Sequence, residues 1–195
     1  MTRLIKSVTV PVGESGKWKV SRFEVTKGQA DLASMRAVFN GGRGAISAGE
    51  YTQLTRNGLI VMSDTPDEKM DHFEPVRKAH GHVLINGLGL GMVLGAILEK
   101  SEVDRVTVVE IDQDLIHLVG PHYACDKLEI VNASAFDYAP PRWIIYGVVW
   151  HDIWDDICTD NIKEMTKLKR KYWRRAKWQG CWSEFQSRQH LKRYA

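Results

Sequence analysis

Cysteine is scarce in this sequence, with three residues in a chain of 195. The three lie far apart and form no Cys-x-x-Cys pair of the kind that binds zinc or takes part in redox exchange. So few cysteines are typical of a reducing compartment, and the histidines show no metal-ligand spacing either. We therefore expect a cytoplasmic protein without a metal site. The cysteines are Cys125, Cys158 and Cys181.

Long hydrophobic runs are missing as well. No apolar run approaches the roughly 18 residues that a membrane helix needs, and the first residues lack the apolar core of a signal peptide. No Ser-His-Asp or Cys-His signature supports hydrolytic nucleophile chemistry. Hydrophobic residues make up 44% and charged residues 26% of the chain, which are ordinary values for a globular protein. We expect a soluble chain of one main domain with a small appendage and no membrane partner.

Charge is distributed unevenly. From Asn161 onward there are 11 Lys and Arg against 2 acids, a balance of +9, so the residues before it carry −6 of the total of +3. The stretch KLKRKYWRRAKWQGCWSEF interleaves basic and aromatic side chains, which could contact phosphates and unpaired bases. The same pattern is typical of an amphipathic helix that packs its aromatic side chains on a sheet. We favour the helix and keep nucleic acid as an alternative partner.

The first part of the chain, residues 1–64, predicts a β-rich extension. Strands are expected at 4–12 and 17–25 around a Gly-containing turn, and a helix at 29–39 before Asn-Gly-Gly. A hairpin is expected at 51–63, where Asn57-Gly58 suits a type I′ turn.

Residues 65–195 predict a different architecture. A helix should begin at Thr65 with a capping box closed by Glu68, and Pro75 should kink or end it. Strands then alternate with helices, which is typical of a parallel sheet covered on both faces. The sequence therefore predicts a Rossmann-like three-layer αβα sandwich of mostly parallel strands. The expected strands are 82–86, 105–111, 128–133 and 143–153, and the expected helices are 92–100, 113–123 and 161–178.

Three glycines stand between the first of these strands and its helix, in NGLGLGM. The turn at the carboxyl end of a parallel strand is where ligands bind in such sheets, and glycine allows close approach of a ligand to the backbone. Glu110 follows Gly91 by 19 residues at the tip of the next strand, where an acid can accept hydrogen bonds from a ribose. The pattern indicates a nucleoside site. The alternative is a tight turn that holds no ligand.

The glycine pattern is G-x-G-x-G, since Met92 occupies the position of the third glycine in a dinucleotide fingerprint. It resembles the first motif of class I S-adenosylmethionine-dependent transferases. Residues 50–156 resemble the spermidine synthase family more specifically, through a hairpin carrying Gln, an acidic helix with His, VVEID, NASAFDY and YGVVWHDIWDD.

This resemblance implies a set of site residues for an S-adenosylmethionine cofactor. Gln53 and the glycines would lie at its methionine end, Glu110 would hold the ribose, and the residues after the third strand would border the adenine. Asp152 would take the place of the catalytic acid, with Asp155 beside it. The implied cofactor-binding residues are Gln53, Gly87, Gly89, Gly91, Glu110, Ser134 and Ala135.

The residues themselves leave two alternatives open at the fourth strand. His151 could serve as the base in place of Asp152, although side chains alternate along a strand and one of the pair points away. Asp152 could also be a helix N-cap. We expect His72 and His80, on the preceding helix, to be surface residues.

The chain departs from the spermidine synthase pattern in ways that decide the predicted function. Leu90 replaces the acid that meets the aminopropyl amine, Ser134 replaces the adenine-contacting Asp, and Asp71 replaces a Tyr. We therefore predict an S-adenosylmethionine-dependent methyltransferase whose acceptor the sequence does not name. A small-molecule substrate is the expected partner, and a homodimer is compatible with this function. The alternatives are an aminopropyltransferase acting on a polyamine, and a non-catalytic nucleoside- or nucleic-acid-binding protein.

Overall fold

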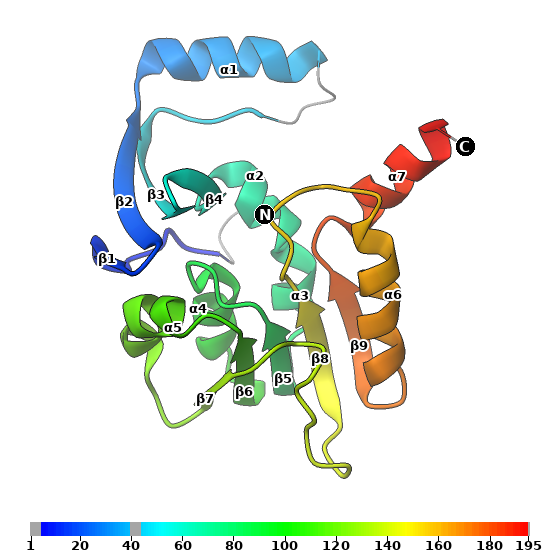
Figure 1. Ribbon diagram of the computed structural model, residues 1–195. Coiled ribbons are helices and arrows are strands. Elements are labelled where there is room, and N and C mark those ends of the chain that lie inside the picture. Colours follow the sequence, from blue (N-terminus) through cyan, green and yellow to red (C-terminus); the bar gives the residue numbers. More distant parts are fainter. Residues whose placement is uncertain (1–4, 40–43, 195) are drawn as a thin grey trace.

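The computed structural model describes residues 5–39 and 44–194, which form two sheets (Figure 1). The N-terminal sheet is antiparallel with the order β1-β2-β3-β4, and the second sheet is parallel with the order β7-β6-β5-β8-β9. The first sheet consists of β1 (Gly13–Ser15), β2 (Trp18–Val25), β3 (Gly49–Arg56) and β4 (Leu59–Ser63), with α1 (Lys27–Phe39) between β2 and β3.

The expected hairpin is confirmed. Asn57 and Gly58 have φ of 52° and 81°, as a type I′ turn requires. The strand expected at 4–12 is wrong over residues 5–12, the part that the structure describes, because backbone groups there bond to side chains instead of a neighbouring strand. The N–H of Val8 donates to Asp64 Oδ2 at 2.8 Å, and Arg22 donates to the carbonyl of Val8 at 3.0 Å.

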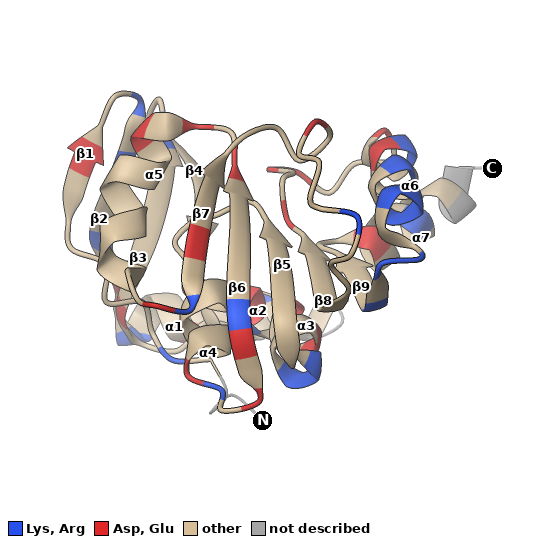
Figure 2. Ribbon diagram, turned by 90° about the horizontal axis from the view of Figure 1, so that it is seen from below, with Lys and Arg blue, Asp and Glu red and all other residues tan. Residues whose placement is uncertain are grey.

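The parallel sheet has the predicted Rossmann-like αβα arrangement. Alternate residues of its strands face opposite layers: Ile85 belongs to a buried cluster that also holds Val76, Leu94 and Leu115, whereas Leu84 belongs to another that holds Tyr172. Figure 2 shows the sheet with its flanking helices from below. The strands are β5 (Gly81–Asn86), β6 (Val103–Glu110), β7 (Leu128–Asn132), β8 (Tyr146–His151) and β9 (Ala176–Cys181). The helices are α2 (Pro66–Asp71), α3 (Phe73–Lys78), α4 (Met92–Leu98), α5 (Gln113–Val119), the 3-10 turn η2 (Gly120–Tyr123), α6 (Asn161–Tyr172) and α7 (Glu184–Tyr194).

Two of the expected helices differ from those observed. The helix from Thr65 is split at His72, where φ is −96° and ψ is 4°. Pro75 cannot donate to the carbonyl of Asp71, so the helix cannot run continuously through this point. Thr65 makes no side-chain capping bond. The helix expected at 161–178 ends at Tyr172, and part of its sequence forms β9 instead.

The two sheets share one hydrophobic core. Trp18 and Leu54 from the N-terminal sheet belong to the same buried cluster as Ile85 and Leu90. The N-terminal sheet thereby lies against the carboxyl edge of the parallel sheet. No described helix is both long and apolar enough to span a membrane.

Candidate functional site

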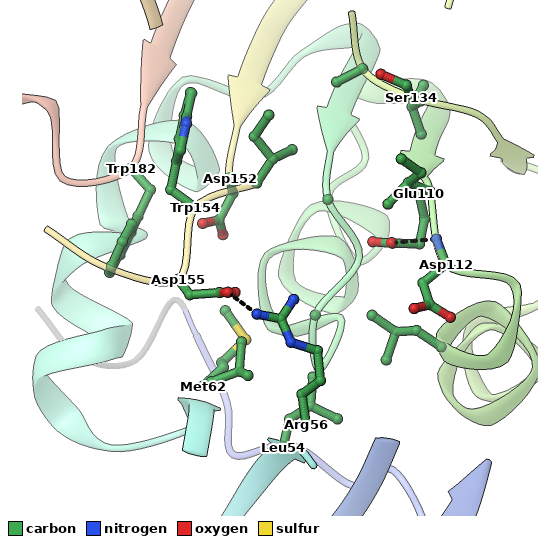
Figure 3. Close-up of a pocket in the computed structure, with 18 of the residues that line it drawn as sticks. Leu54, Arg56, Met62, Glu110, Asp112, Ser134, Asp152, Trp154, Asp155 and Trp182 are labelled. Atoms are coloured by element: carbon green, nitrogen blue, oxygen red, sulfur yellow. Dashed lines mark hydrogen bonds and ion pairs between the residues drawn. The ribbon is translucent and has the colours of Figure 1, made fainter. Parts of the chain in front are cut away.

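A cavity of about 380 Å³ lies between the two sheets at the carboxyl edge of the parallel one (Figure 3). Its floor consists of the residues that directly follow β5, β6, β7 and β8, and its opposite wall includes Leu54, Arg56 and Met62 of the N-terminal hairpin. This volume falls within the range of small-molecule sites. The location is the edge where ligands bind in sheets of this type.

Most of the residues singled out from the sequence line this one cavity. They come from four different strand ends, and the fold brings them together across 69 positions of sequence, from 87 to 155. Their roles in binding and catalysis remain predictions. The lining includes Gly87, Gly89, Glu110, Ser134, Ala135, Asp152 and Asp155.

Gln53 and His151 lie outside the cavity, which corrects two predictions. Leu54 and Arg56 face the cavity from β3, so Gln53, which directly precedes Leu54, points to the other face, where its Nε2 donates to Ser21 Oγ at 3.2 Å. His151 is fully buried, with Nδ1 2.7 Å from Asn86 Nδ2, and burial lowers its pKa to about 4. His151 therefore cannot act as a base on a ligand in this cavity.

The glycine turn has left-handed backbone at all three glycines. The φ values are 99° at Gly87, 51° at Gly89 and 69° at Gly91, which L-residues adopt only with strain. A Cβ on Gly87 would overlap the carbonyl oxygen of Asp152, and one on Gly91 would overlap the ring of Tyr123. Two of the three glycines are therefore needed for packing within the protein itself. Gly91 directly precedes α4 and is not part of the cavity lining, and its role at the methionine end of a ligand stays a prediction.

Glu110 joins the glycine turn to the end of β6. Its Oε2 accepts a hydrogen bond from the Leu88 N–H, and its Oε1 accepts one from the Asp112 N–H, both at 2.9 Å. The residue is 7% exposed. Burial raises the pKa of this carboxyl, and the two backbone donors oppose that change. Each oxygen keeps a second lone pair, so the carboxylate can still accept from a ligand hydroxyl in the cavity.

The hairpin contributes a residue that the sequence reasoning missed. Met62 reaches over the glycine turn, and its Sδ accepts a hydrogen bond from the Leu90 N–H at 3.4 Å. A Cβ on Gly89 would lie 2.8 Å from this sulfur. Leu90 itself is fully buried in the core, so it contributes no side chain to the cavity.

Asp152 faces the cavity at the tip of β8, with its side chain 14% exposed. Burial, together with the nearby carboxylate of Glu68, raises the pKa of Asp152 to about 8. The chain continues as a loop to α6 at Asn161, so the alternative that Asp152 caps a helix is wrong.

His72 lies behind Asp152 rather than at the surface, which corrects the expectation for this residue. It is fully buried, and its Nε2 is 3.7 Å from Asp152 Oδ2. Burial lowers the pKa of His72 to about 4. Within the described part of the chain, neither ring nitrogen has a hydrogen-bond partner.

The end of the cavity near Asp152 combines tryptophans with carboxyl groups (Figure 3). Trp154 and Trp182 line it, and Trp154 Nε1 donates to Glu164 Oε2 at 2.8 Å. Arg56 spans from the hairpin to pair with Asp155. The whole lining holds more acids than bases. The acids are Glu68, Glu110, Asp112, Asp152, Asp155 and Glu164, and the bases are Lys17 and Arg56.

Several basic side chains of the C-terminal segment make contacts within the protein. Lys169 pairs with Glu184 at 2.9 Å, and Arg188 pairs with the same carboxylate. Lys171 donates to the carbonyl of Phe136 at 2.8 Å. These contacts support the interpretation that the segment stabilises the fold, and a nucleic-acid partner remains an untested prediction. No group of three His, Cys, Asp or Glu suited to a metal ion occurs among the described residues.

No family model and no curated protein matches this chain. Among solved structures it is similar to the N-methyltransferase NodS from Bradyrhizobium japonicum WM9, with 12% identity and a TM-score of 0.46 over 58% of this chain and 64% of that one. It is also similar to the plantazolicin methyltransferase BpumL in complex with SAH, with 15% identity and a TM-score of 0.40 over 54% of this chain and 40% of that one. A dimethyladenosine transferase from Plasmodium falciparum aligns at 20% identity and a TM-score of 0.36, over 45% of this chain and 32% of that one. This chain thus spans less than two thirds of the length of each of these proteins.

Proposed function

We propose that this protein is an S-adenosylmethionine-dependent methyltransferase. One observation carries the proposal: a single cavity at the carboxyl edge of the parallel sheet is lined by the glycine turn, Glu110 and Asp152. The hydrogen bond from the Leu88 N–H to Glu110 supports the proposal further, because it joins the glycine turn to the end of β6. A bound nucleoside would contact both elements, with its ribose at Glu110 and the rest of the cofactor at the glycine turn.

The lining residues are compatible with one orientation of the bound cofactor. In this proposal Glu110 accepts hydrogen bonds from the ribose hydroxyls, and Ser134 and Ala135, which line the same cavity, border the adenine. Gly89 and Met62 lie on the other side, at the methionine end. When bound, the cofactor supplies a methyl group that is already activated by the positive charge on sulfur. The protein then has to orient the acceptor and exclude water.

We assign Asp152 as the residue that takes the proton from the acceptor. It stands at the cavity wall in reach of a bound molecule, and its raised pKa of about 8 suits a group that exchanges protons near neutral pH. His72 does not itself line the cavity, and it acts as a positioning residue behind Asp152.

We infer that the acceptor is a small cationic amine. Carboxyl groups outnumber bases in the lining, which favours a positively charged ligand. Trp154 and Trp182 add aromatic faces, on which an ammonium group is stabilised by cation–π attraction.

Aminopropyl transfer to a polyamine is the second candidate, and the same acidic end of the cavity favours it. The buried position of Leu90 counts against it, since the acid that would meet the aminopropyl amine has no counterpart there. A binding protein without catalysis is the third.

Calorimetry with S-adenosylmethionine, S-adenosylhomocysteine and decarboxylated S-adenosylmethionine tests these candidates. We expect the first two to bind and the decarboxylated form to bind more weakly, and we expect mass spectrometry to detect methylation within a panel of small amines. Preference for the decarboxylated form would favour aminopropyl transfer. Tight binding without any product would favour the non-catalytic candidate, and failure of all three to bind would overturn the nucleoside site.

A further inference from the structure

Helix α1 has one face on the protein and one face in solvent. Ala30 and Ala37 are buried, whereas Leu32 is 56%, Met35 64% and Phe39 88% exposed. Figure 1 shows α1 at the far end of the N-terminal sheet, away from the parallel sheet. Several large exposed apolar side chains on one helix face mark an interaction surface rather than a solvated one.

Leu32, Met35 and Phe39 follow the spacing of a coiled-coil seam, and the exposed Val38 lies beside it at a g position. Gly28, Leu32, Met35 and Phe39 succeed one another at intervals of four, three and four residues, which places them at alternating d and a positions of a heptad. The buried Ala30 and Ala37 then fall at f positions, on the opposite side of the helix. This surface, defined by Gly28, Leu32, Met35 and Phe39, is called the α1 seam.

Two charged residues flank the α1 seam on opposite sides. Asp31 occupies a g position and Arg36 the e position five residues later. In a parallel pair of identical helices, a g residue of one helix faces the e residue five positions later on the other. Asp31 of each copy would therefore pair with Arg36 of the other, which gives two ion pairs. In an antiparallel pair, equal positions face each other and like charges would meet. Neither residue forms an ion pair within the described part of the chain.

We propose that the α1 seam is a self-association surface, on which two copies of this chain pair through parallel α1 helices about a two-fold axis. Leu32 packs against Leu32 of the second copy, and two Asp31–Arg36 ion pairs fix the direction. One helix of 13 residues is short for an interface of standard size. The dimer is therefore weak, and it forms in a concentration-dependent way. The proposal is independent of the ligand in the cavity.

Sedimentation velocity of the full chain over a series of concentrations tests the interface. We expect wild type to shift from monomer to dimer with rising concentration, and Leu32→Glu to stay monomeric. Ser34→Glu is the matched control, since Ser34 is exposed on the same helix outside the seam, and it should dimerise like wild type. A monomer at every concentration, or a Leu32→Glu variant that still dimerises, would overturn the proposal.

Charge exchange tests the direction of the helices. We expect Asp31→Lys or Arg36→Glu alone to weaken the dimer by about fivefold, as expected for the loss of two exposed ion pairs. The double variant Asp31→Lys, Arg36→Glu should restore it, because the pairs re-form with reversed charges. If both single variants weaken the dimer and the double variant does not restore its affinity, the parallel arrangement is excluded.

Crosslinking supplies a second measurement. Leu32→Cys, in a chain with Cys125→Ser and Cys158→Ser, should form a disulfide-linked dimer under mild oxidation, and Ser34→Cys in the same background should not. Efficient crosslinking of the control with none at position 32 would place the interface elsewhere.

Discussion

The Nε2 atom of His72 lies 3.7 Å from Oδ2 of Asp152, with both side chains withdrawn from bulk water. Burial acts on the two groups in opposite directions, lowering the pKa of His72 to about 4 and raising that of Asp152 to about 8. Between these values the pair consists of a neutral imidazole and a neutral carboxylic acid. It is therefore not an ion pair at neutral pH, and Asp152 acquires its charge only as the pH approaches 8.

Stability should fall as the pH rises from 6.5 to 8. Because its pKa is raised, Asp152 stabilises the fold at low pH, and this stability is lost as the pH rises through about 8. Because its pKa is lowered, His72 has the opposite effect: its contribution is lost as the pH falls from 6.5 to about 4. The two effects oppose each other between pH 4 and 6.5, and above 6.5 only that of Asp152 remains. We expect a loss of about 2 kcal/mol in the free energy of unfolding, since each pH unit contributes about 1.4 kcal/mol.

Urea unfolding of wild type and Asp152→Asn at several pH values measures this loss. Asn cannot titrate, so the variant should show a flatter profile between pH 6.5 and 8. Profiles of equal slope would mean that other groups cause the pH dependence.

Asp152→Asn should also separate binding from catalysis. Asp152 is assigned to the acceptor, so we expect the dissociation constant for S-adenosylmethionine to stay nearly unchanged while kcat falls by about 10²- to 10⁴-fold, the usual contribution of a general base. In wild type, kcat should rise with pH toward a plateau above pH 8, and the variant should lack this titration. Equal losses of binding and turnover would make the role of Asp152 structural.

Glu110→Ala should weaken S-adenosylmethionine binding by about 1.5–3 kcal/mol, the range for hydrogen bonds to a charged group. Glu129→Ala is the matched control, because Glu129 is an exposed carboxylate that pairs with Arg105 on the sheet, outside the cavity lining. Calorimetry compares the two variants. Glu110 also accepts hydrogen bonds from the Leu88 and Asp112 amides. A thermal melt of each variant should therefore accompany the calorimetry, to detect any loss of stability. An affinity equal to that of the control would remove Glu110 from the site.

The parallel sheet and the floor of the cavity could be predicted because their signals are local. Strands such as 82–86 are short, apolar and bounded by glycine, and parallel strands end at a common edge. Gly87, Glu110, Ser134 and Asp152 each lie at the end of a strand or within two residues of it, so the alternation of strands and helices is enough to bring them together.

The opposite wall of the cavity could not be predicted, since it depends on how the N-terminal sheet docks. Strand alternation shows that Gln53 and Leu54 face opposite ways, but only the packed structure shows that Leu54 faces the ligand edge. Met62 lines the cavity for the same reason, since its position depends on how the N-terminal hairpin docks on the glycine turn. His72 is buried because the helix breaks at that residue and α3 continues against β8.

The charge pattern of the C-terminal segment concealed a strand. Residues 161–178 are rich in Lys and Arg, which are good helix formers, so a continuous helix was the natural prediction. Trp178 instead stacks on Trp150 of the neighbouring strand, with ring centroids 6.3 Å apart. Packing of this kind between distant residues outweighs local propensity.

Gly87→Ala should destabilise the protein much more than Gly58→Ala, although both glycines have positive φ. At Gly58 nothing lies within 4 Å of the added methyl group, so the cost is the backbone strain alone, about 1 kcal/mol. At Gly87 the methyl group would overlap the carbonyl oxygen of Asp152, and the strand end that carries the proposed base would have to move. We expect a further loss of about 1–3 kcal/mol in unfolding free energy, together with reduced turnover that Gly58→Ala does not show. Chemical denaturation and kinetic assays of the two variants measure both effects, and similar values for the two would mean that the close contact between β5 and β8 does not hold in solution.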